Sequence, residues 1–488
     1  MSRLTFVGQK ENTWPTNRTT TGDSVLDGVL GGGFPRNRVI YVTGNPGTGK
    51  TSLAAAFIYK GVKDQDESGL YVSFSETKEI FYSDMKTLGF DFQSLEETKK
   101  FEYMELVISS DLDLRMVSDK IVTALVRFRP QRLVIDPFSL IAQSQDNPYK
   151  ARETMDKLFR KIVSTMECTT LLVGEQPSGE VKLGTASEEF VSDGVLNLKH
   201  TFPREIEIRK MRGTKIRREN MFYTIGKKGF QTVRTRLSIP DRPKKWQPIP
   251  DSGDRLSSGC PDLDRIIGGG FPRGAYVVVE AGRNVTLEET RLLSDGTAMN
   301  FVSQQRGVIF STTGGEATDK ISNSLLPYLT GEGLSQYLRV VEYNKMRLGE
   351  PVQHKRVVPP TSDELGYESR MGKMYDDMKK ATRSQPIFQW VGNDTLANSF
   401  SMVQDTKITR RIESSIAENR NGQDLTIALT RPSLKKLDAL LDMVNWHLKI
   451  WKENGVLLFQ GVKPETHLYA ADSSIDLGYP VMSLTELD

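Results

Sequence analysis

The chain has 488 residues, of which 38% are hydrophobic and 26% charged, and its formal net charge of +3 argues against a general nucleic-acid coat while leaving a local basic patch open. This length suits two or three domains, and the longest apolar runs are too short to cross a bilayer, which takes about 20 residues. The cysteines Cys168 and Cys260 lie far apart and the N-terminus lacks a signal-peptide pattern, so we expect a cytoplasmic protein without membrane insertion.

The first half of the chain alternates strand and helix signals. Short apolar runs predict strands at residues 38–44, 69–74, 132–136 and 169–174. Runs of helical character lie at 51–62, 78–90 and 149–168. This alternation indicates a parallel sheet covered by helices on both faces. After about residue 190 the pattern becomes strand-like, and we expect an antiparallel extension.

The sequence GNPGTGKT at 44–51 matches the phosphate-loop pattern G-x-x-x-x-G-K-[ST]. It follows a predicted strand and opens a predicted helix, which is the context that supports the motif. Its glycines let the backbone wrap closely, so that N–H groups and the helix N-terminus face phosphate oxygens. The residues expected to bind ATP are Gly44, Asn45, Pro46, Gly47, Thr48, Gly49, Lys50, Thr51 and Ser52.

Three further groups are needed for hydrolysis. Lys50 is expected to reach the β- and γ-phosphates, and Thr51 with Asp136, which ends the strand RLVID, is expected to hold Mg²⁺. Glu76 follows the second strand and is the candidate for polarising the attacking water, with Glu79 a weaker candidate. The basic stretch 209–218 offers cations for the transferring phosphoryl group. As alternatives, Asp136 caps a turn, Glu76 is a solvated helix-start residue, and 209–218 is a solvated hairpin or a nucleic-acid patch.

The sequence contains an internal duplication of one domain. Residues 21–43 align with 258–280 at an offset of 237, from Gly31 to Gly268, including the shared GGGFPR. The expected organisation is a first domain at 1–235 with the intact phosphate loop, a linker rich in proline and charge at 236–255, and a degenerate second domain at 256–488.

The second copy follows the same order more loosely. The runs AYVVVEA, GVIFST and LTIALT are strand-like, and the polar, proline-interrupted stretch 344–373 is expected to form a long loop.

Residues 21–54, TGDSVLDGVLGGGFPRNRVIYVTGNPGTGKTSLA, resemble the opening of KaiC-type ATPases of the RecA superfamily. The resemblance covers about residues 5–235 well and about 250–470 loosely. It implies an α/β fold of two tandem RecA-like P-loop domains, each with a mostly parallel sheet flanked by helices. The family commonly carries two glutamates after the second strand, whereas this chain has Ser75 followed by Glu76.

The same resemblance implies a homo-oligomeric ring, commonly a hexamer. The stretch KMRGT at 210–214 matches a family segment whose Lys and Arg reach the nucleotide of a neighbouring subunit, so Lys210 and Arg212 are expected to act in trans. The segment EFVSDG at 189–194 also has a family counterpart. By similarity to RecA-type switch positions, Glu175 or Gln176 is a candidate sensor of the γ-phosphate.

The second copy has lost the phosphate-binding residues. At the offset of 237, Gly44 becomes Ala281, Gly49 becomes Thr286, Lys50 becomes Leu287 and Thr51 becomes Glu288. A carboxylate there repels a polyanion. The strand at 386–392 does not end in an aspartate, Asp394 being displaced, and no counterpart of KMRGT follows. We expect no ordinary ATP site and no autokinase activity in this domain, the alternative being a divergent but working pocket.

The favoured function is that of a slow regulatory ATPase with cofactors ATP and Mg²⁺, whose second domain is a scaffold or the surface for an unidentified protein partner. A DNA-dependent ATPase of RecA type is a second hypothesis, although no aromatic and basic platform for nucleic acid is found. A non-hydrolysing, ATP-dependent transcriptional regulator is a third.

Overall fold

The chain divides into two compact units, Met1–Val233 with Leu487–Asp488, and Arg234–Glu486. The computed structural model describes residues 17–106, 114–138, 166–175, 192–216, 218–235, 237–311, 318–341, 357–358, 364–393, 405–431 and 441–488. The stretch expected to be a linker packs within the second unit. Its Trp246 is buried there and donates its backbone N–H to the carbonyl of Tyr328 at 2.9 Å.

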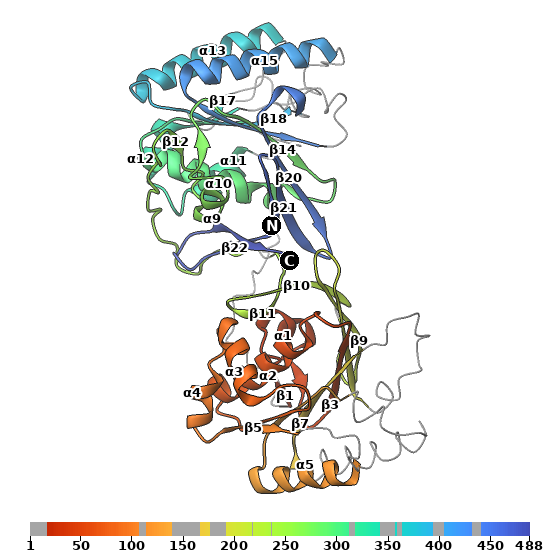
Figure 1. Ribbon diagram of the computed structural model, residues 1–488. Coiled ribbons are helices and arrows are strands. Elements are labelled where there is room, and N and C mark those ends of the chain that lie inside the picture. The colour runs from red at the N-terminus through yellow and green to blue at the C-terminus, as the bar shows by residue number, and fades with distance from the viewer. Residues whose placement is uncertain are drawn as a thin grey trace. The chain divides into compact units, whose positions relative to one another are not determined.

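The first unit contains a nine-stranded main sheet and a separate two-stranded sheet of β1 (Arg18–Thr19) and β2 (Phe34–Pro35) among its described residues, drawn from red to yellow-green in Figure 1. The strands of the main sheet are β3 (Val39–Gly44), β4 (Gly69–Ser73), β5 (Phe101–Glu105), β6 (Arg132–Asp136), β7 (Thr169–Glu175), β8 (Gly194–Lys199), β9 (Glu205–Met211), β10 (Asn220–Gly226) and β11 (Gly229–Thr232). Its helices are α1 (Ser24–Leu30), α2 (Lys50–Gln65), α3 (Lys78–Thr87), α4 (Phe92–Glu97) and α5 (Leu114–Phe128).

Within the described residues the main sheet of this unit has the order β11-β10-β9-β8-β3-β7-β6-β4-β5. Helices α1 to α4 pack on one face, around a core that includes Phe57 and Tyr71, while α5 packs on the other face through Ile121. Strand β8 is parallel to β3, whereas each of the strands β9, β10 and β11 is antiparallel to the strand before it. The antiparallel extension, expected after about residue 190, therefore begins at β9, one strand later than the sequence predicts. The predicted helix at 149–168 lies almost wholly outside the described residues.

The second unit repeats this plan with its own strands. They are β12 (Arg255–Leu256), β13 (Phe271–Pro272), β14 (Tyr276–Ala281), β15 (Val308–Ser311), β16 (Leu338–Val341), β17 (Val357–Val358), β18 (Phe388–Gly392), β19 (Leu425–Thr430), β20 (Trp446–Glu453), β21 (Val456–Lys463), β22 (Glu465–Ser474) and β23 (Val481–Glu486). Its helices are α9 (Pro261–Ile266), α10 (Leu287–Ser303), α11 (Thr318–Leu325), α12 (Gly331–Tyr337), α13 (Glu364–Ala381) and α15 (Asp405–Gly422).

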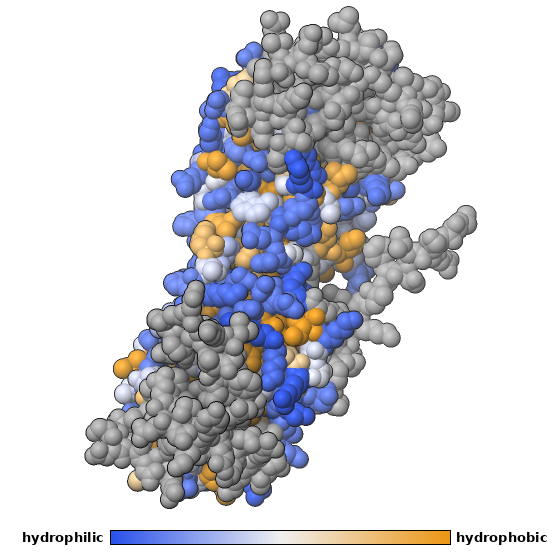
Figure 2. Space-filling model, turned by 90° about the vertical axis from the view of Figure 1, so that its right-hand side faces the viewer, coloured by the Kyte–Doolittle hydropathy of each residue, from blue (hydrophilic) through white to orange (hydrophobic). Residues whose placement is uncertain are grey.

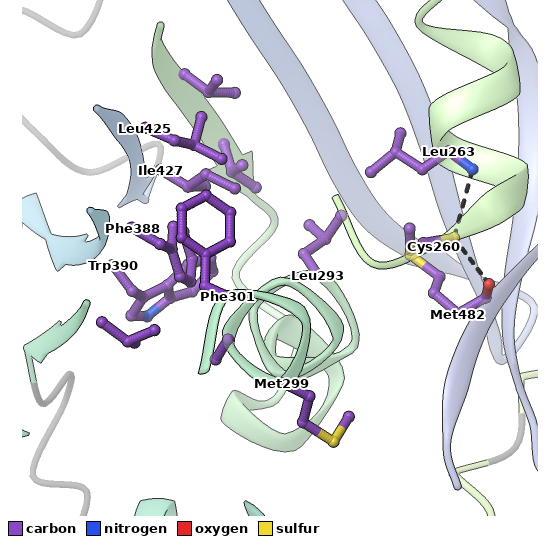
Figure 3. Packing of buried hydrophobic residues seen from close by; sticks show 14 of the residues in the cluster. Cys260, Leu263, Leu293, Met299, Phe301, Phe388, Trp390, Leu425, Ile427 and Met482 are labelled. Atoms are coloured by element: carbon purple, nitrogen blue, oxygen red, sulfur yellow. Dashed lines mark hydrogen bonds between the residues drawn. The ribbon is translucent and has the colours of Figure 1, made fainter. Parts of the chain in front are cut away.

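The main sheet of the second unit has the order β17-β16-β15-β18-β19-β14-β20-β21-β22-β23 among the described residues. Its core packs around α10, where Phe301 lies beside Phe388 (Figure 3). In the same view the buried thiol of Cys260 donates a hydrogen bond to the carbonyl of Met482 at 2.9 Å and accepts one from the N–H of Leu263 at 3.3 Å. The thiol thereby caps α9 and fastens it to β23.

One expectation for the second unit is wrong. Residues 364–373, placed in a long loop because of their polar composition, form the first half of α13. The helix presents a narrow apolar stripe, in which Met371, Met374, Tyr375 and Met378 recur at the three- and four-residue spacing of one helix face. This stripe packs on Ile309 and Ile387, so tertiary burial outweighs the polar average. Residues 344–356 and 359–363 of the expected loop lie outside the described residues.

The shared GGGFP sequence has a structural role in both units. Each copy forms a short strand, β2 or β13, that pairs antiparallel with β1 or β12. The last glycine of each triplet has a positive φ, 99° for Gly33 and 112° for Gly270. A Cβ at Gly33 would lie 2.1 Å from the carbonyl oxygen of Thr19, and one at Gly270 would lie 2.4 Å from that of Leu256. Only glycine allows this close approach, so the repeated motif builds the fold rather than the chemistry.

The surface is mixed in character. On the face shown in Figure 2, hydrophilic and hydrophobic side chains are interspersed over the coloured area. The large hydrophobic residues that are exposed come from many elements and include Phe202, Met116 and Leu477. Scattered exposure of this kind is ordinary for a folded chain. None of the described helices combines the length and apolar character that crossing a membrane requires.

Candidate nucleotide-binding site

The phosphate loop of the first unit joins β3 to α2. Strand β3 is buried between β7 and β8, and α2 begins at Lys50 directly after the loop. Gly49 precedes the helix with φ +83°, and a Cβ there would lie 2.1 Å from Cδ1 of Ile225. Because Gly49 has no capping side chain, it leaves the first N–H groups of α2 available to an anion.

Lys50 lies over this loop. Its side chain is buried at 8% relative exposure, and Nζ donates hydrogen bonds to the carbonyl oxygens of Gly44 and Asn45, each at 2.9 Å. The ammonium group is therefore held at the mouth of the glycine-rich turn. A polyphosphate bound to the loop N–H groups would meet this cation first.

Thr51 and Asp136 form a pair at the carboxyl edge of the sheet. The Thr51 hydroxyl donates a hydrogen bond to Oδ2 of Asp136 at 2.8 Å. The buried Tyr71 hydroxyl donates to the same oxygen at 2.7 Å, and burial together with the Asp136 charge raises the pKa of Tyr71 well above its usual range. A hydroxyl beside a carboxylate fits Mg²⁺, which takes few protein ligands and completes its shell with water and phosphate oxygens. None of the described residues forms a group of three or more histidine, cysteine, aspartate or glutamate side chains that could hold a metal ion.

Glu76 lies near this pair. It follows β4, whose last residue Ser73 pairs with Asp136, and its N–H donates to Oγ of Ser73 at 3.1 Å. Burial first, and then the negative charges of Asp136 and Asp84, raise the pKa of the Glu76 carboxyl. A carboxylate with a raised pKa is a stronger proton acceptor than a solvated one. Glu79 is exposed in the first turn of α3.

Lys210 and Arg212 lie at the other edge of the sheet. Lys210 pairs with Val195 near the start of β8, and its Nζ donates to the carbonyl of Ser192 at 2.7 Å. Arg212 has a side chain that is 63% exposed, with Nη1 placed 3.4 Å from Oδ1 of Asp193. Since β8 runs parallel to β3, this is the amino edge, whereas the phosphate loop leaves the carboxyl edge. The two cations therefore do not meet the loop of their own subunit.

Two sequence candidates for sensing the γ-phosphate have side chains outside the described residues. Glu175 ends β7 opposite Gly44, at the loop edge of the sheet, but its side chain lies outside the described residues, as does Gln176. Of the segment 189–194, only its last three residues are described. Asp193 there accepts a hydrogen bond from the backbone N–H of Val39 at 3.4 Å.

In the second unit the corresponding loop has the same length, but its last residue caps the following helix. Strand β14 ends at Ala281 and α10 begins at Leu287, so the offset of 237 holds across the turn. Thr286 caps α10: its hydroxyl accepts from the N–H of Glu289 at 3.2 Å, and the Glu289 carboxylate accepts from the N–H of Thr286 at 2.9 Å. The capping box thereby satisfies two backbone N–H donors, those of Thr286 and Glu289, at the place where the first unit would bind phosphate.

Two basic side chains complete the closure of this loop. Arg431 follows β19 and donates through Nη1 to the carbonyls of Gly282 and Val285, at 2.5 and 3.0 Å. Gly282 corresponds to Asn45, so a guanidinium takes the place on the loop that the Lys50 ammonium has in the first unit. Lys452 forms an ion pair of 2.5 Å with Glu289.

The sequence reasoning for this loop was incomplete. It emphasised Glu288, which is exposed, and missed Glu289, which is buried and forms the cap. The signal was present, because Thr286 to Glu289 reads T-x-x-E, the signature of a capping box. Following the sheet register, Gly392 at the end of β18 takes the place of Asp136, so this position has no carboxylate in the second unit.

A phosphate loop between a central parallel strand and a helix, with an aspartate on a nearby strand, defines the first unit as a RecA-type P-loop NTPase domain. A family model for the KaiC ATPase matches residues 19–235. The first unit is therefore similar to the KaiC ATPases over almost its whole length, and the match covers less than half of the chain.

The chain is also similar to individual curated proteins and to one solved structure. The chain is similar to circadian clock oscillator protein KaiC of Prochlorococcus marinus strain MIT 9313, with 26% identity over 307 residues, covering 60% of this chain and 59% of that protein. It is 28% identical over 306 residues to KaiC of Synechococcus elongatus, covering 59% of this chain and 56% of the relative. The chain thus spans less than two thirds of these relatives. A solved structure of a KaiC-like protein from Pyrococcus horikoshii shows 31% identity, a TM-score of 0.40, and coverage of 45% of this chain and 100% of its own.

Proposed function

We propose that this protein binds Mg·ATP in its first unit and hydrolyses it slowly as a regulatory ATPase. The observation that carries the proposal is the Thr51–Asp136 hydrogen bond of 2.8 Å beside the buried Lys50 of the phosphate loop. A loop, a cation and a magnesium-binding pair are thereby assembled at one edge of one sheet. This combination serves nucleoside triphosphates better than any other ligand class.

Each residue has a proposed role. The backbone N–H groups of 44–52 bind phosphate oxygens, and Lys50 neutralises the β- and γ-phosphates. Thr51 and Asp136 hold Mg²⁺, whose charge offsets that of the phosphates when it is bound. Glu76 orients and deprotonates the attacking water, helped by its raised pKa.

The proposed site is completed by a second copy of the chain. Lys210 and Arg212 lie at the amino edge, away from their own loop, and Arg212 is largely exposed. A head-to-tail arrangement of subunits would bring this edge of one copy to the loop edge of the next, which generates a ring. We propose such a ring, with six subunits by resemblance to the family, in which the two cations stabilise phosphoryl charge in trans.

We further propose that the second unit is a pseudo-ATPase that serves as a scaffold or a surface for a protein partner. The self-capped loop at Thr286 supports this role, because the cap uses backbone N–H groups that would otherwise bind phosphate. Arg431 additionally holds the carbonyls of Gly282 and Val285 in this loop. The proposed location of the protein is the cytoplasm.

Native mass measurement of the full chain with and without Mg·ATP tests these proposals together. The expected result is a nucleotide-stabilised ring with one nucleotide per chain, and no bound nucleotide in Lys50→Ala. Two nucleotides per chain would overturn the pseudo-ATPase proposal, and retention of nucleotide by Lys50→Ala would overturn the site.

A non-hydrolysing switch is the second candidate, favoured by Ser75 in place of the first family glutamate. Phosphate release measured on the nucleotide-loaded ring separates the two functions. Turnover that depends on Glu76 supports the ATPase, and binding without turnover supports the switch. Stimulation by single-stranded DNA would instead favour a DNA-dependent ATPase.

A further inference from the structure

The outer side of the phosphate loop is held by two donors from the β9–β10 region. The Tyr223 hydroxyl, on β10, donates a hydrogen bond to the carbonyl oxygen of Thr48 at 2.6 Å. Arg204, directly before β9, donates through Nη1 to the carbonyl oxygen of Gly47 at 2.8 Å. Two successive peptide groups of the loop are therefore fixed from outside.

Because these carbonyls are held, the N–H group on the opposite side of each peptide is oriented as well. In a planar trans peptide the C=O of one residue and the N–H of the next point in opposite directions. The contact on Thr48 therefore turns the N–H of Gly49 away from Tyr223, toward the inner side of the loop where phosphate binds. Glycine-rich backbone has wide conformational freedom, so an unheld loop would lose this orientation part of the time.

Both donors are themselves well supported. The Tyr223 side chain is fully buried, and its ring stacks on Phe230 with a centroid distance of 4.7 Å. Burial raises the pKa of Tyr223 to about 12, so the hydroxyl keeps its proton at neutral pH. Arg204 forms an ion pair of 2.9 Å through Nε with Asp488, a residue that groups with the first unit.

The second unit provides an internal comparison. In the first unit, Tyr223 pairs with Thr232 on the neighbouring strand, and the N–H of Thr232 donates to Asp23, the residue that caps α1. In the second unit, Ser473 pairs with Met482 on the neighbouring strand, and the carbonyl of Met482 accepts from Cys260, the residue that caps α9. Asp23 and Cys260 are repeat partners, so Ser473 takes the place of Tyr223.

The serine does not serve the neighbouring loop, since its hydroxyl donates to the carbonyl of Ser238 at 3.5 Å. The connection that carries Arg204 in the first unit, residues 200–204, is also replaced in the second, by the two-residue turn Asn454–Gly455. Both donors are therefore present beside the open loop and absent beside the self-capped one, within the described residues.

We propose that Tyr223 and Arg204 are positioning residues that hold the phosphate loop in its nucleotide-binding shape before ATP arrives. The inference rests on the proposed function of the first unit, because a loop needs this shape only if it binds phosphate. Their loss should weaken nucleotide binding through a less ordered loop, without removing any group that touches the nucleotide.

The experiment uses Tyr223→Phe, Arg204→Ala and Arg204→Lys in the full chain. A fluorescent ATP analogue with Mg²⁺ gives the Kd, and phosphate release gives KM and kcat. Tyr223→Phe, which loses a hydrogen bond to a buried carbonyl, should raise Kd and KM about 5- to 10-fold, and Arg204→Ala, whose hydrogen bond to Gly47 is exposed, should raise both by a smaller factor. The kcat should change less than about twofold, since binding of the ground state and of the transition state falls together. Arg204→Lys, which keeps a donor, should recover part of the loss.

Tyr59→Phe is the matched control. It removes a hydroxyl from a buried tyrosine on α2 whose oxygen contacts Lys63, near the far end of the helix from the loop. Its Kd should equal that of the unaltered chain.

If Tyr223→Phe and Arg204→Ala lower the melting temperature of the nucleotide-free protein but leave Kd unchanged, their role is only structural and the inference is overturned. The variant Lys50→Ala distinguishes a failure of the proposed function from a failure of the positioning role. If its Kd equals that of the unaltered chain, the proposed function fails. If it loses binding while the other variants keep it, only the positioning role fails.

Discussion

The hydroxyl of Thr51 and the carboxylate of Asp136 are hydrogen-bonded at 2.8 Å although 85 residues separate them in the sequence. Thr51 is in the first turn of α2, and Asp136 is the last residue of β6. The parallel sheet places the start of the helix and the end of the strand at one edge. The site therefore depends on the topology of the sheet as much as on the loop motif.

Asp136→Asn should weaken the magnesium dependence of ATP binding. The amide keeps the shape of the side chain and a hydrogen-bonding oxygen, but removes the charge that holds the ion and its waters. We expect the apparent Mg²⁺ affinity to fall about 10- to 100-fold. Titrating Mg²⁺ against bound nucleotide measures this, and binding in excess chelator should be the same in both proteins. An unchanged Mg²⁺ titration would show that Asp136 only orders the turn.

The pH dependence of hydrolysis should report Glu76. Its pKa is raised by burial and by neighbouring negative charges, so the carboxylate takes up a proton at a higher pH than an ordinary glutamate. Activity should therefore fall on acidification at a pH above the usual value of about 4.3. Glu76→Gln should remove this limb together with most turnover, while nucleotide affinity stays the same. A profile with the same acid limb in Glu76→Gln contradicts the assignment.

Mixed rings test the action of Lys210 and Arg212 in trans. A double variant, Lys210→Ala with Arg212→Ala, and the single variant Glu76→Gln should each have little turnover alone. After mixing in equal amounts, about one quarter of interfaces would combine an intact loop side with an intact cation side. Phosphate release should recover to about that fraction. A mixture no more active than its components would contradict the shared site.

Thr286→Ala should separate folding from nucleotide binding in the second unit. The substitution removes half of the capping box on α10, so this unit should lose about 1 kcal/mol of stability. Thermal unfolding followed by a probe in the second unit measures the loss. Nucleotide stoichiometry should stay at one per chain. The matched change in the first unit, Gly49→Ala, should weaken nucleotide binding strongly, because Gly49 has φ +83°, which an alanine rarely adopts, and its Cβ would also displace Cδ1 of Ile225.

Arg132 is expected to be the most costly single cation to remove from the first unit. It is fully buried, with Nε placed 2.5 Å from Glu67 and Nη1 placed 2.6 Å from the carbonyl of Phe57. Arg132→Ala leaves the Glu67 charge buried with fewer partners and should cost about 3–5 kcal/mol. Arg127→Ala, which breaks an exposed ion pair with Glu102, should cost less than about 1 kcal/mol. Equal losses in chemical denaturation would contradict this ranking.

Much of the fold could be predicted because its signals are local. The strands at 38–44 and 132–136 are short apolar runs, and the repeat at an offset of 237 gave the second unit from the first. The helix over 364–373 could not be predicted from composition, since its burial depends on a narrow stripe of methionines against distant strands.

The site was predictable as far as it follows a motif. Lys50, Thr51 and Asp136 occur in recognisable patterns, and the sheet brings Thr51 and Asp136 together. The sequence does not predict the contacts of Tyr71, Tyr223 and Arg431. Tyr71 and Tyr223 lie on strands, and Arg431 lies directly after one, that have no signature of their own. Their contacts follow from strand order and register, which short-range sequence patterns do not encode.

The closed loop of the second unit has a further consequence through the Thr286 cap. The Thr286 hydroxyl and the Glu289 carboxylate act as ligands tethered to the loop N–H groups. A tethered group competes at an effective concentration of about millimolar or more, and it does not dissociate into bulk solvent. A soluble nucleotide would have to displace several such contacts at once. Under the proposed function, the second unit carries its own competitor for these N–H groups, so that ATP would bind to only one half of each chain.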